Sequence, residues 1–374
     1  MSLQDEIIEK SSKIFRDSYQ MSIGELINIY RDEEMDIHPE FQRVFRWSDA
    51  QKTRLIESIM LNIPIPSIFV SQNEQGIWDV IDGVQRLSTI FQFVGIFKDD
   101  DGVKLDPLKL LKTDYLPSFE NMLWDNKENP EKSFNKEQQL AFKRSRIDVI
   151  IVKKESDPNT KYELFQRLNT GGTRLSDQEV RNCLMIMTNR DFYHFIFELS
   201  NNADFKNCVS ISDRKEDEQF KLELVLRLLI AQYIDFDTIR SYSDLRDLLD
   251  KETINLIEQL DENLDENSYT SIQADFERTF KILNNTLGED SFKKFSEGKY
   301  KGPFLVSAFQ CIASGVLNNL DYLESLDSSK IEEIIKSIYT DEEYLRSIQS
   351  GSQAIPRFKD LTLLGRQLFS NEDK

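Results

Sequence analysis

The chain has 374 residues, and 47 Lys and Arg stand against 66 Asp and Glu, which gives a net charge of −19. At about 150 residues per domain, this length predicts two domains and a substantial core. The negative charge excludes a broad surface that coats nucleic-acid phosphates, so any contact with nucleic acid must be local.

Two helices near the N-terminus are predicted from capping patterns. Ser22 precedes Glu25 by three positions, and Ser48 precedes Gln51 in the same way. In this S-x-x-E/Q pattern, the two side chains satisfy free backbone N–H groups at the start of a helix. We therefore expect helices over residues 22–30 and from residue 48 to the prolines at 64 and 66, which cannot continue a helix.

Two strands joined by a hairpin-like turn are expected next. Residues 67–72 and 77–81 have strand character and are separated by Asn73-Glu74-Gln75-Gly76, a typical turn sequence. Asp82-Gly83 closes the second strand, and residues 85–94 resume with helical periodicity. Residues 35–38 are expected to form a short extended segment before Pro39.

The rest of the N-terminal half contains a polar stretch, a strand and two further helices. Residues 98–140 are polar and rich in turn formers, which indicates an insertion. The β-branched run 147–152 predicts a buried strand, and 162–168 predicts a helix that is broken by Asn169-Thr170-Gly171-Gly172-Thr173. Ser176 with Glu179 then predicts the start of another helix.

Beyond about residue 190 the pattern is almost entirely helical. Apolar side chains recur at i, i+3 and i+4 over 220–233, 245–260, 271–287 and 331–339. The uncharged run from Gly302 to Leu320 contains Gln310 and two asparagines, so it predicts a buried helix rather than a membrane span. We expect no membrane association.

Cysteine and histidine are scarce in this chain. The three cysteines, Cys183, Cys208 and Cys311, are widely spaced and form no CxxC pair, which excludes a disulfide framework and a thiolate zinc site. A reducing compartment and a cytoplasmic location are therefore expected, in keeping with an N-terminus that lacks the apolar core of a signal peptide. With only His38 and His194, the chain cannot assemble a histidine-based zinc hydrolase or a His-Asn-His nuclease.

Charge is distributed unevenly along the sequence. Residues 201–374 hold 21 basic and 33 acidic side chains, a net charge of −12. Residues 141–190 hold 10 basic and 6 acidic side chains, a net charge of +4. The basic stretch coincides with the Gly171-Gly172 loop, which makes this loop a candidate site for an anionic ligand.

Three segments could carry chemistry, and the first is Pro39–Trp47. Arg43 and Arg46 flank aromatic residues, an arrangement that can set guanidinium groups against a phosphate. Alternatively, the aromatic side chains are core anchors that the arginines cover. For this segment alone, composition favours the second interpretation.

The second segment is Val80–Thr89, where a strand turns through Gly83 into a helix. Free N–H groups and the positive end of the helix dipole would gather at residues 84–86, and Arg86 adds a cation there. Asp82 could hold a metal ion, orient Arg86 or cap the helix, and the sequence leaves these three roles open.

The third segment is Phe165–Glu179. Adjacent Gly171 and Gly172 allow a close backbone approach to a ligand, and threonines and arginines supply hydrogen-bond donors on both sides. A helix C-cap followed by an N-cap would explain Gly171 and Ser176 but not the clustered arginines. No segment matches a Walker loop or a GxGxxG fingerprint.

Together, these segments resemble the N-terminal domain family of the GmrSD restriction endonucleases. The DGQQR motif of that family reads Asp82-Gly83-Val84-Gln85-Arg86 here, with Val84 in place of the first glutamine. Three further elements match: P-x-F-Q-R-x-x-x-W at 39–47, L-I-x-S-I-x-x-x-I-P-x-P at 55–66 and N-T-G-G-x-x-L-S at 169–176. The resemblance covers about residues 19–185.

The resemblance implies a fold and a site. It implies a fold similar to ParB and sulfiredoxin, with a small mixed sheet. Together with the polar stretch at about 98–140, which we interpret as an insertion, this predicts an α+β domain over residues 1–190. A mostly α-helical domain over residues 191–374 would follow. In such a domain the strand-to-helix turn binds nucleotide phosphates, and Asp82, Gln85 and Arg86 would be catalytic. The implied phosphate-binding residues are Gly83, Val84, Gln42, Arg43, Asn169, Thr170, Gly171, Gly172 and Arg174.

The implied function is the binding and hydrolysis of a nucleoside triphosphate in prokaryotic DNA restriction or anti-phage defence. Mg²⁺ or another divalent cation, held partly by Asp82, would assist. One alternative is a non-catalytic module in which nucleotide binding switches the acidic helical half, which then recruits a protein partner. Another is a metal-dependent DNA nickase that uses the same pocket. DNA and a protein partner therefore stay open as partners besides the nucleotide.

Overall fold

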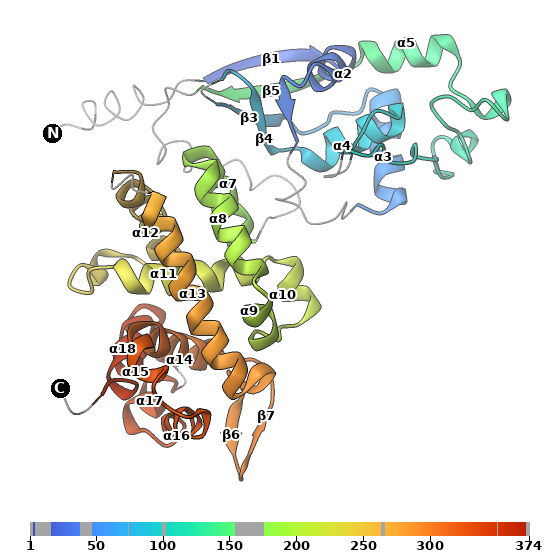
Figure 1. Cartoon of the computed structure of the whole chain (residues 1–374). Helices are drawn as coiled ribbons and strands as arrows, with labels where there is room; N and C mark the ends of the chain where they lie inside the picture. The colour runs from blue at the N-terminus through green and yellow to red at the C-terminus, as the bar shows by residue number, and fades with distance from the viewer. Residues whose placement is uncertain are drawn as a thin grey trace. The chain divides into compact units, whose positions relative to one another are not determined.

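The computed structural model describes residues 16–37, 47–73, 75–98, 102–153, 176–262, 266–349 and 351–371, together with Leu3. The chain divides into two compact units, residues 1–175 and 176–374, and each is described by itself (Figure 1). By its contacts, the helix that follows Ser176 belongs to the second unit. The boundary predicted from the sequence, after residue 190, assigns that helix to the first domain.

A five-stranded mixed sheet forms the first unit, with the strand order β1-β5-β3-β4-β2 (Figure 1). The strands are β1 (Arg16–Ser22), β2 (Met35–Asp36), β3 (Ile68–Gln72), β4 (Trp78–Asp82) and β5 (Arg146–Val152). β1 pairs antiparallel with β5, and β3 pairs antiparallel with β4, whereas β5 with β3 and β4 with β2 are parallel. The predicted α+β class with a mixed sheet is confirmed.

In the described residues of this unit, four α-helices accompany the sheet: α2 (Ile23–Arg31), α3 (Asp49–Met60), α4 (Val84–Val94) and α5 (Lys136–Arg144). Ser22 and Ser48 cap α2 and α3 as the sequence predicts, since each hydroxyl accepts a hydrogen bond from the backbone N–H three residues on. The β3–β4 hairpin is confirmed as well. The side chain of Asn73 fixes its turn by accepting hydrogen bonds from the N–H groups of Gln75 and Ile77, at 3.0 Å each.

The stretch at about 98–140 contributes to the core of the first unit. Its described residues include two short 3₁₀ helices, Pro117–Phe119 and Pro130–Lys132, and the start of α5. Phe134 packs edge to face against Phe93 of α4, with ring centroids 5.0 Å apart. Apolar side chains of this stretch therefore cover α4, a role that its polar composition did not reveal.

The second unit is mostly helical, as predicted. The predicted segments 220–233, 245–260, 271–287 and 331–339 correspond to α11 (Phe220–Tyr233), α12 (Leu245–Glu262), α13 (Glu266–Thr286) and α16 (Ser328–Ile338). The uncharged run corresponds to α14 (Val306–Asn318), which is largely buried. Within the described residues, no helix is both long and apolar enough to cross a membrane. The helices are α7 (Asp177–Thr188), α8 (Arg190–Asn201), α9 (Ala203–Cys208), α10 (Asp213–Asp217), α11 (Phe220–Tyr233), α12 (Leu245–Glu262), α13 (Glu266–Thr286), α14 (Val306–Asn318), α15 (Leu320–Leu323), α16 (Ser328–Ile338), α17 (Glu342–Ser347) and α18 (Ala354–Leu368).

Two glycines let α14 and α18 cross in close contact. A Cβ atom on Gly365 would lie 1.9 Å from the carbonyl oxygen of Cys311, and one on Gly315 would lie 2.6 Å from the carbonyl oxygen of Gly365. Both distances are too short for a side chain. The backbones of the two helices therefore touch, and this contact forms the centre of the C-terminal bundle.

Three strands were not predicted from the sequence. β1 is an edge strand with a polar sequence, and its pairing with β5 joins residues that are far apart in the chain. β6 (Lys294–Ser296) and β7 (Lys299–Lys301) form a hairpin in the region that was expected to be almost entirely helical. β6 and β7 have three residues each, which is too short for an alternating pattern to reveal them.

Candidate functional site

The turn between β4 and α4 is the first candidate site. β4 ends at Asp82, Gly83 adopts the left-handed conformation with φ 101°, and α4 begins at Val84. A Cβ atom on Gly83 would lie 2.9 Å from Cγ1 of Ile68 in the neighbouring strand. Both the positive φ and this close approach require glycine, so the sharp entry from strand to helix depends on Gly83.

The N-terminus of α4 differs from those of its neighbours because no side chain caps it. The other described helices of the first unit, α2, α3 and α5, follow Ser22, Ser48 and Asn135, and each of these side chains accepts a backbone hydrogen bond. The first turn of α4 also contains no acidic residue. The partial positive charge of this helix end is therefore not offset by a cap of its own, which favours an anion there.

Arg86, in the first turn of α4, is buried and fixes the geometry of the strand-to-helix turn. Its Nη2 donates to Oδ2 of Asp82 at 2.8 Å. Its Nη1 donates to the carbonyl oxygens of Pro66 at 2.5 Å and Ser67 at 3.1 Å, just before β3. One guanidinium therefore connects the end of β4, the start of β3 and the first turn of α4.

Of the roles left open for Asp82, the structure shows the orienting one, since its carboxylate pairs with Arg86. The Asp82 side chain is 34% exposed and that of Arg86 is 10% exposed, so the carboxylate is the more accessible member of the pair. Three hydrogen bonds occupy three of the five N–H donors of Arg86. A ligand at the turn would meet Asp82 and the helix end first, and Arg86 mainly through its remaining donors.

Several predicted site residues lie outside the described part of the chain. This holds for Gln42, Arg43, Asn169, Thr170, Gly171, Gly172 and Arg174. Of the predicted site, the structure brings together Asp82, Gly83, Val84, Gln85 and Arg86. The participation of the other residues stays a prediction.

The side chains at the turn determine how the predicted divalent cation could bind there. Within the described residues, no group of three or more His, Cys, Asp or Glu side chains could hold a metal ion. Asp82 alone could provide a single carboxylate ligand. Mg²⁺ is commonly held by one or two carboxylates together with phosphate oxygens and water, so these residues fit a cation that arrives with a phosphorylated ligand.

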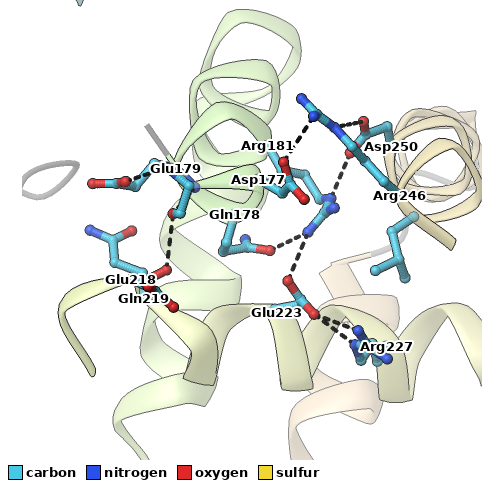
Figure 2. A network of polar contacts seen from close by, with 12 residues as sticks. Asp177, Gln178, Glu179, Arg181, Glu218, Gln219, Glu223, Arg227, Arg246 and Asp250 are labelled. Atoms are coloured by element: carbon cyan, nitrogen blue, oxygen red, sulfur yellow. Dashed lines mark hydrogen bonds and ion pairs between the residues drawn. The ribbon is translucent and has the colours of Figure 1, made fainter. Parts of the chain in front are cut away.

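The second unit contains a buried polar network around Arg181 of α7 (Figure 2). Nε of Arg181 donates to Oδ1 of Asp250 in α12 at 2.9 Å, and Nη1 donates to the side-chain oxygen of Gln178. Nη1 also lies 3.7 Å from Oε2 of Glu223 in α11. The Arg181 side chain is 1% exposed, so three helices meet at one fully desolvated cation.

Two further arginines extend this network at its edges (Figure 2). Arg227 pairs with Glu223 at 2.6 Å. Arg246 pairs with Asp177 at 2.9 Å and lies 3.7 Å from Oδ2 of Asp250. Two carboxylates of the network therefore contact two arginines each. Glu223 contacts Arg181 and Arg227, and Asp250 contacts Arg181 and Arg246.

Burial shifts the pKa values of this network. It lowers the pKa of Arg181 to about 10 and raises the pKa of the Asp250 carboxyl to about 8. For Glu223, burial acts in the upward direction, but Arg227 and Arg181 outweigh it and lower the pKa. The network is a closed structural site, because its central groups are satisfied by one another and shielded from solvent.

The start of α7 is also fixed within this unit. The N–H of Ser176 donates to Oε2 of Glu179 at 2.7 Å, and the N–H of Glu179 donates to the Ser176 hydroxyl, as the predicted capping box requires. The Ser176 hydroxyl also donates to the carbonyl oxygen of Glu218 at 3.3 Å. The sequence revealed this cap but not the Arg181 network, for which a charged residue within the apolar run of α7 was the available signal.

The first unit is an α+β domain. Its strand β4 enters helix α4 through the left-handed Gly83, beside the Asp82–Arg86 pair, and this geometry favours an anion at the start of the helix. The comparison with protein families identifies it further: residues 23–186 match the model of the GmrSD restriction endonuclease, N-terminal domain. This match confirms, for that region, the resemblance found in the sequence. No curated protein and no solved structure matches the chain.

The matched range contains both the Asp82–Arg86 turn and most of α7. It therefore extends beyond the first compact unit, which ends at residue 175, into the first helix of the second unit. The family suggests a protein of the restriction or defence type.

Proposed function

We propose that the GmrSD-type domain binds a nucleoside triphosphate at the Asp82–Arg86 turn and hydrolyses it, as the nucleotide-dependent part of a restriction or defence system. The observation that carries this proposal is the uncapped, acid-free N-terminus of α4 behind a left-handed glycine. Backbone N–H groups at such a turn bind phosphate oxygens, and the helix dipole favours the negative charge.

Hydrolysis of a nucleoside triphosphate requires few chemical groups at the turn. Transfer of a phosphoryl group to water needs in-line positioning and charge stabilisation rather than a covalent nucleophile. Asp82 is held in one orientation by Arg86, so its free oxygen can position a water molecule or a cation ligand. A divalent cation would neutralise charge on the phosphate oxygens. Gln85, at the second position of α4, is a polar group beside the expected phosphate position.

Arg86 is proposed to act in two ways. Its hydrogen bonds to Asp82 and to the carbonyl oxygens of Pro66 and Ser67 make it a positioning residue, and its remaining donors can reach a phosphate. Gln42 and Arg43, and the loop residues Asn169, Thr170, Gly171, Gly172 and Arg174, are proposed to complete the site. Their motifs are part of the resemblance, and the arginines supply the charge that a triphosphate needs.

Phosphate release from a panel of nucleoside triphosphates tests this proposal. The full chain with Mg²⁺ is expected to release phosphate from at least one of them, and Arg86→Ala and Asp82→Asn are expected to abolish release. Arg144→Ala, at an exposed position of α5, is the matched control and should leave release unchanged. Circular dichroism confirms that each variant is folded.

Three outcomes separate the proposal from its alternatives. Tight nucleotide binding without phosphate release would contradict hydrolysis and support a nucleotide switch that acts on a protein partner through the acidic helical half. Nicking of DNA that depends on Asp82 and a divalent metal would support the nickase. A folded protein that binds no nucleotide would contradict both the hydrolase and the switch.

A further inference from the structure

The β6–β7 hairpin of the second unit places its lysines on one face. In the antiparallel register, Lys294 lies opposite Lys301, and Ser296 lies opposite Lys299. Side chains of directly opposed residues, and of residues two apart on a strand, point to the same side of a sheet. Lys294, Lys299 and Lys301, all exposed, therefore form one surface, which we call the lysine face.

The opposite face anchors the hairpin to its own unit. The rings of Phe295 and Tyr300, which oppose each other in the register, lie with their centroids 5.0 Å apart. Nζ of Lys336 in α16 lies 5.2 Å from the centroid of the Phe295 ring. The hydroxyl of Tyr339 donates to the carbonyl oxygen of Lys293 at 2.8 Å, at the base of the hairpin. The aromatic side faces the helices and the lysine face is left to solvent.

The lysine face is electrostatically unfavourable in isolation. Like charges directly opposite each other in a hairpin are destabilising, as for Lys294 and Lys301. Glu297 pairs with Lys301 at 2.6 Å, but within the described part of the chain no ion pair involves Lys294 or Lys299. Edge strands often carry a lysine that prevents pairing with other chains, yet a single charge serves that purpose. Three lysines on one face need another explanation.

The hairpin also contrasts in charge with its surroundings. Residues 292–302 hold four lysines and one glutamate, a net charge of +3, whereas residues 201–374 have a net charge of −12. A projecting cationic ribbon on an acidic unit allows an anionic partner to approach the unit at the hairpin (Figure 1). The contact is therefore local, as the overall charge of the chain requires.

We infer that the lysine face binds the phosphate backbone of duplex DNA. Lys299 and Lys301 are two residues apart on an extended strand, so their Cα atoms lie about 7 Å apart, a spacing comparable to that of neighbouring phosphates. Lysine contacts a phosphate as a point charge, and the hairpin offers no planar bidentate group for reading bases. The interaction is thus independent of sequence, and it does not rest on the proposed nucleotide site.

A salt-dependent binding measurement tests this inference. The full chain is titrated against a fluorescent duplex of about 20 base pairs, starting near 50 mM salt, and anisotropy is recorded. The triple variant Lys294→Gln, Lys299→Gln, Lys301→Gln is expected to bind about tenfold more weakly or worse. The slope of log K against log[salt] should become shallower by about 2 to 3, since each lost phosphate contact removes about 0.9.

A matched control removes the same charge elsewhere in the unit. Lys206, Lys281 and Lys330 are exposed on α9, α13 and α16, and their replacement by glutamine should leave the affinity nearly unchanged. An equal loss in both triple variants would show that net charge alone matters and would overturn the inference. Absence of duplex binding by the unmodified chain would overturn it as well and would favour an acidic protein as the partner of the lysine face.

A third variant changes the affinity in the opposite direction. Glu297→Gln removes the carboxylate that pairs with Lys301, so it should tighten duplex binding two- to fivefold, about the effect of one freed phosphate contact. A gain in affinity cannot result from unfolding. Unchanged or weaker binding by Glu297→Gln would contradict the assignment of Lys301 to the contact surface.

Discussion

Each unit of this protein contains a buried arginine that pairs with a carboxylate, yet the two arginines serve different purposes. Arg86 lies in the first turn of the uncapped helix α4, and its partner Asp82 is 34% exposed. Arg181 is 1% exposed, and its partner Asp250 is 5% exposed. A ligand can reach the first pair through Asp82, whereas the second pair is closed.

This difference shows why a charge cluster alone does not identify a site. The Arg181 network contains more ionisable groups than the turn and a carboxyl whose pKa is raised to about 8. Perturbed pKa values often mark functional sites, but here burial and mutual pairing account for them. The turn has fewer charges, but its helix end lacks a cap, which favours an anionic ligand, and the accessible carboxylate of Asp82 could bind a cation that accompanies this ligand.

The largest expected effect is the loss of stability on replacing Arg181 by methionine. The change leaves Asp250, Glu223 and Gln178 buried without their shared donor, which should cost about 3 to 5 kcal/mol. Urea denaturation of the full chain measures the free energy of unfolding. Arg346→Met, at an exposed ion pair on α17, is the control and should change it by less than about 0.5 kcal/mol. Equal effects of the two variants would contradict the closed network.

Asp250 should give the network a characteristic pH dependence. Because its pKa is raised from 3.8 to about 8 in the folded state, the folded protein binds the proton more tightly than the unfolded chain. The stability of the unmodified protein relative to Asp250→Asn should therefore fall as pH rises from about 4 to 8 and then level off. We expect a change of a few kcal/mol, since each unit of the pKa shift corresponds to about 1.4 kcal/mol.

Denaturation of both proteins at several pH values gives this difference directly. A relative stability that rises between pH 4 and 8 would mean that Asp250 is an ordinary ionised partner of Arg181.

Replacing Arg86 by lysine should weaken the turn. A lysine cannot donate at once to Asp82 and to the carbonyl oxygens of Pro66 and Ser67, so the free energy of unfolding should fall by about 2 kcal/mol. Nucleotide affinity, measured by titration calorimetry, should fall at least about tenfold, or about 1.4 kcal/mol. Arg144→Lys on α5 is the matched control. Unchanged stability would contradict the positioning role of Arg86.

The smallest expected effect concerns Gly83. Gly83→Ala imposes a positive φ on alanine and brings its Cβ atom to 2.9 Å from Ile68, so it should cost about 1.5 kcal/mol. Gly102→Ala is the control, because Gly102 also has a positive φ but no atom within 4 Å of the added Cβ. Thermal unfolding should show a larger loss for Gly83→Ala, and equal losses would mean that crowding against β3 is unimportant.

The sequence predicted those features that depend on neighbouring residues. The caps at Ser48 and Ser176, the β3–β4 hairpin and the glycine turn at residue 83 each follow from a few adjacent side chains. The partner of Arg181 could not be predicted in this way, since Asp250 is 69 positions away and on a different helix. The same holds for the pairing of β1 with β5.

The candidate site was predicted in part. Its residues were found from their motif, but their contacts were not: nothing in the spacing of Asp82 and Arg86 shows that Arg86 also holds the carbonyl oxygens before β3. The lysine face was missed because a strand of three residues gives too few alternations to be recognised.

Hydrogen–deuterium exchange of the full chain, with and without a nucleoside triphosphate and Mg²⁺, tests the phosphate site most directly. Bound phosphates accept hydrogen bonds from the first N–H groups of α4, so exchange should slow in peptides that cover Gly83 to Arg86. The peptides of α7 around Arg181, which is already buried, should change little. Protection confined to other parts of the chain, or no protection at saturating nucleotide, would contradict a phosphate site at this turn.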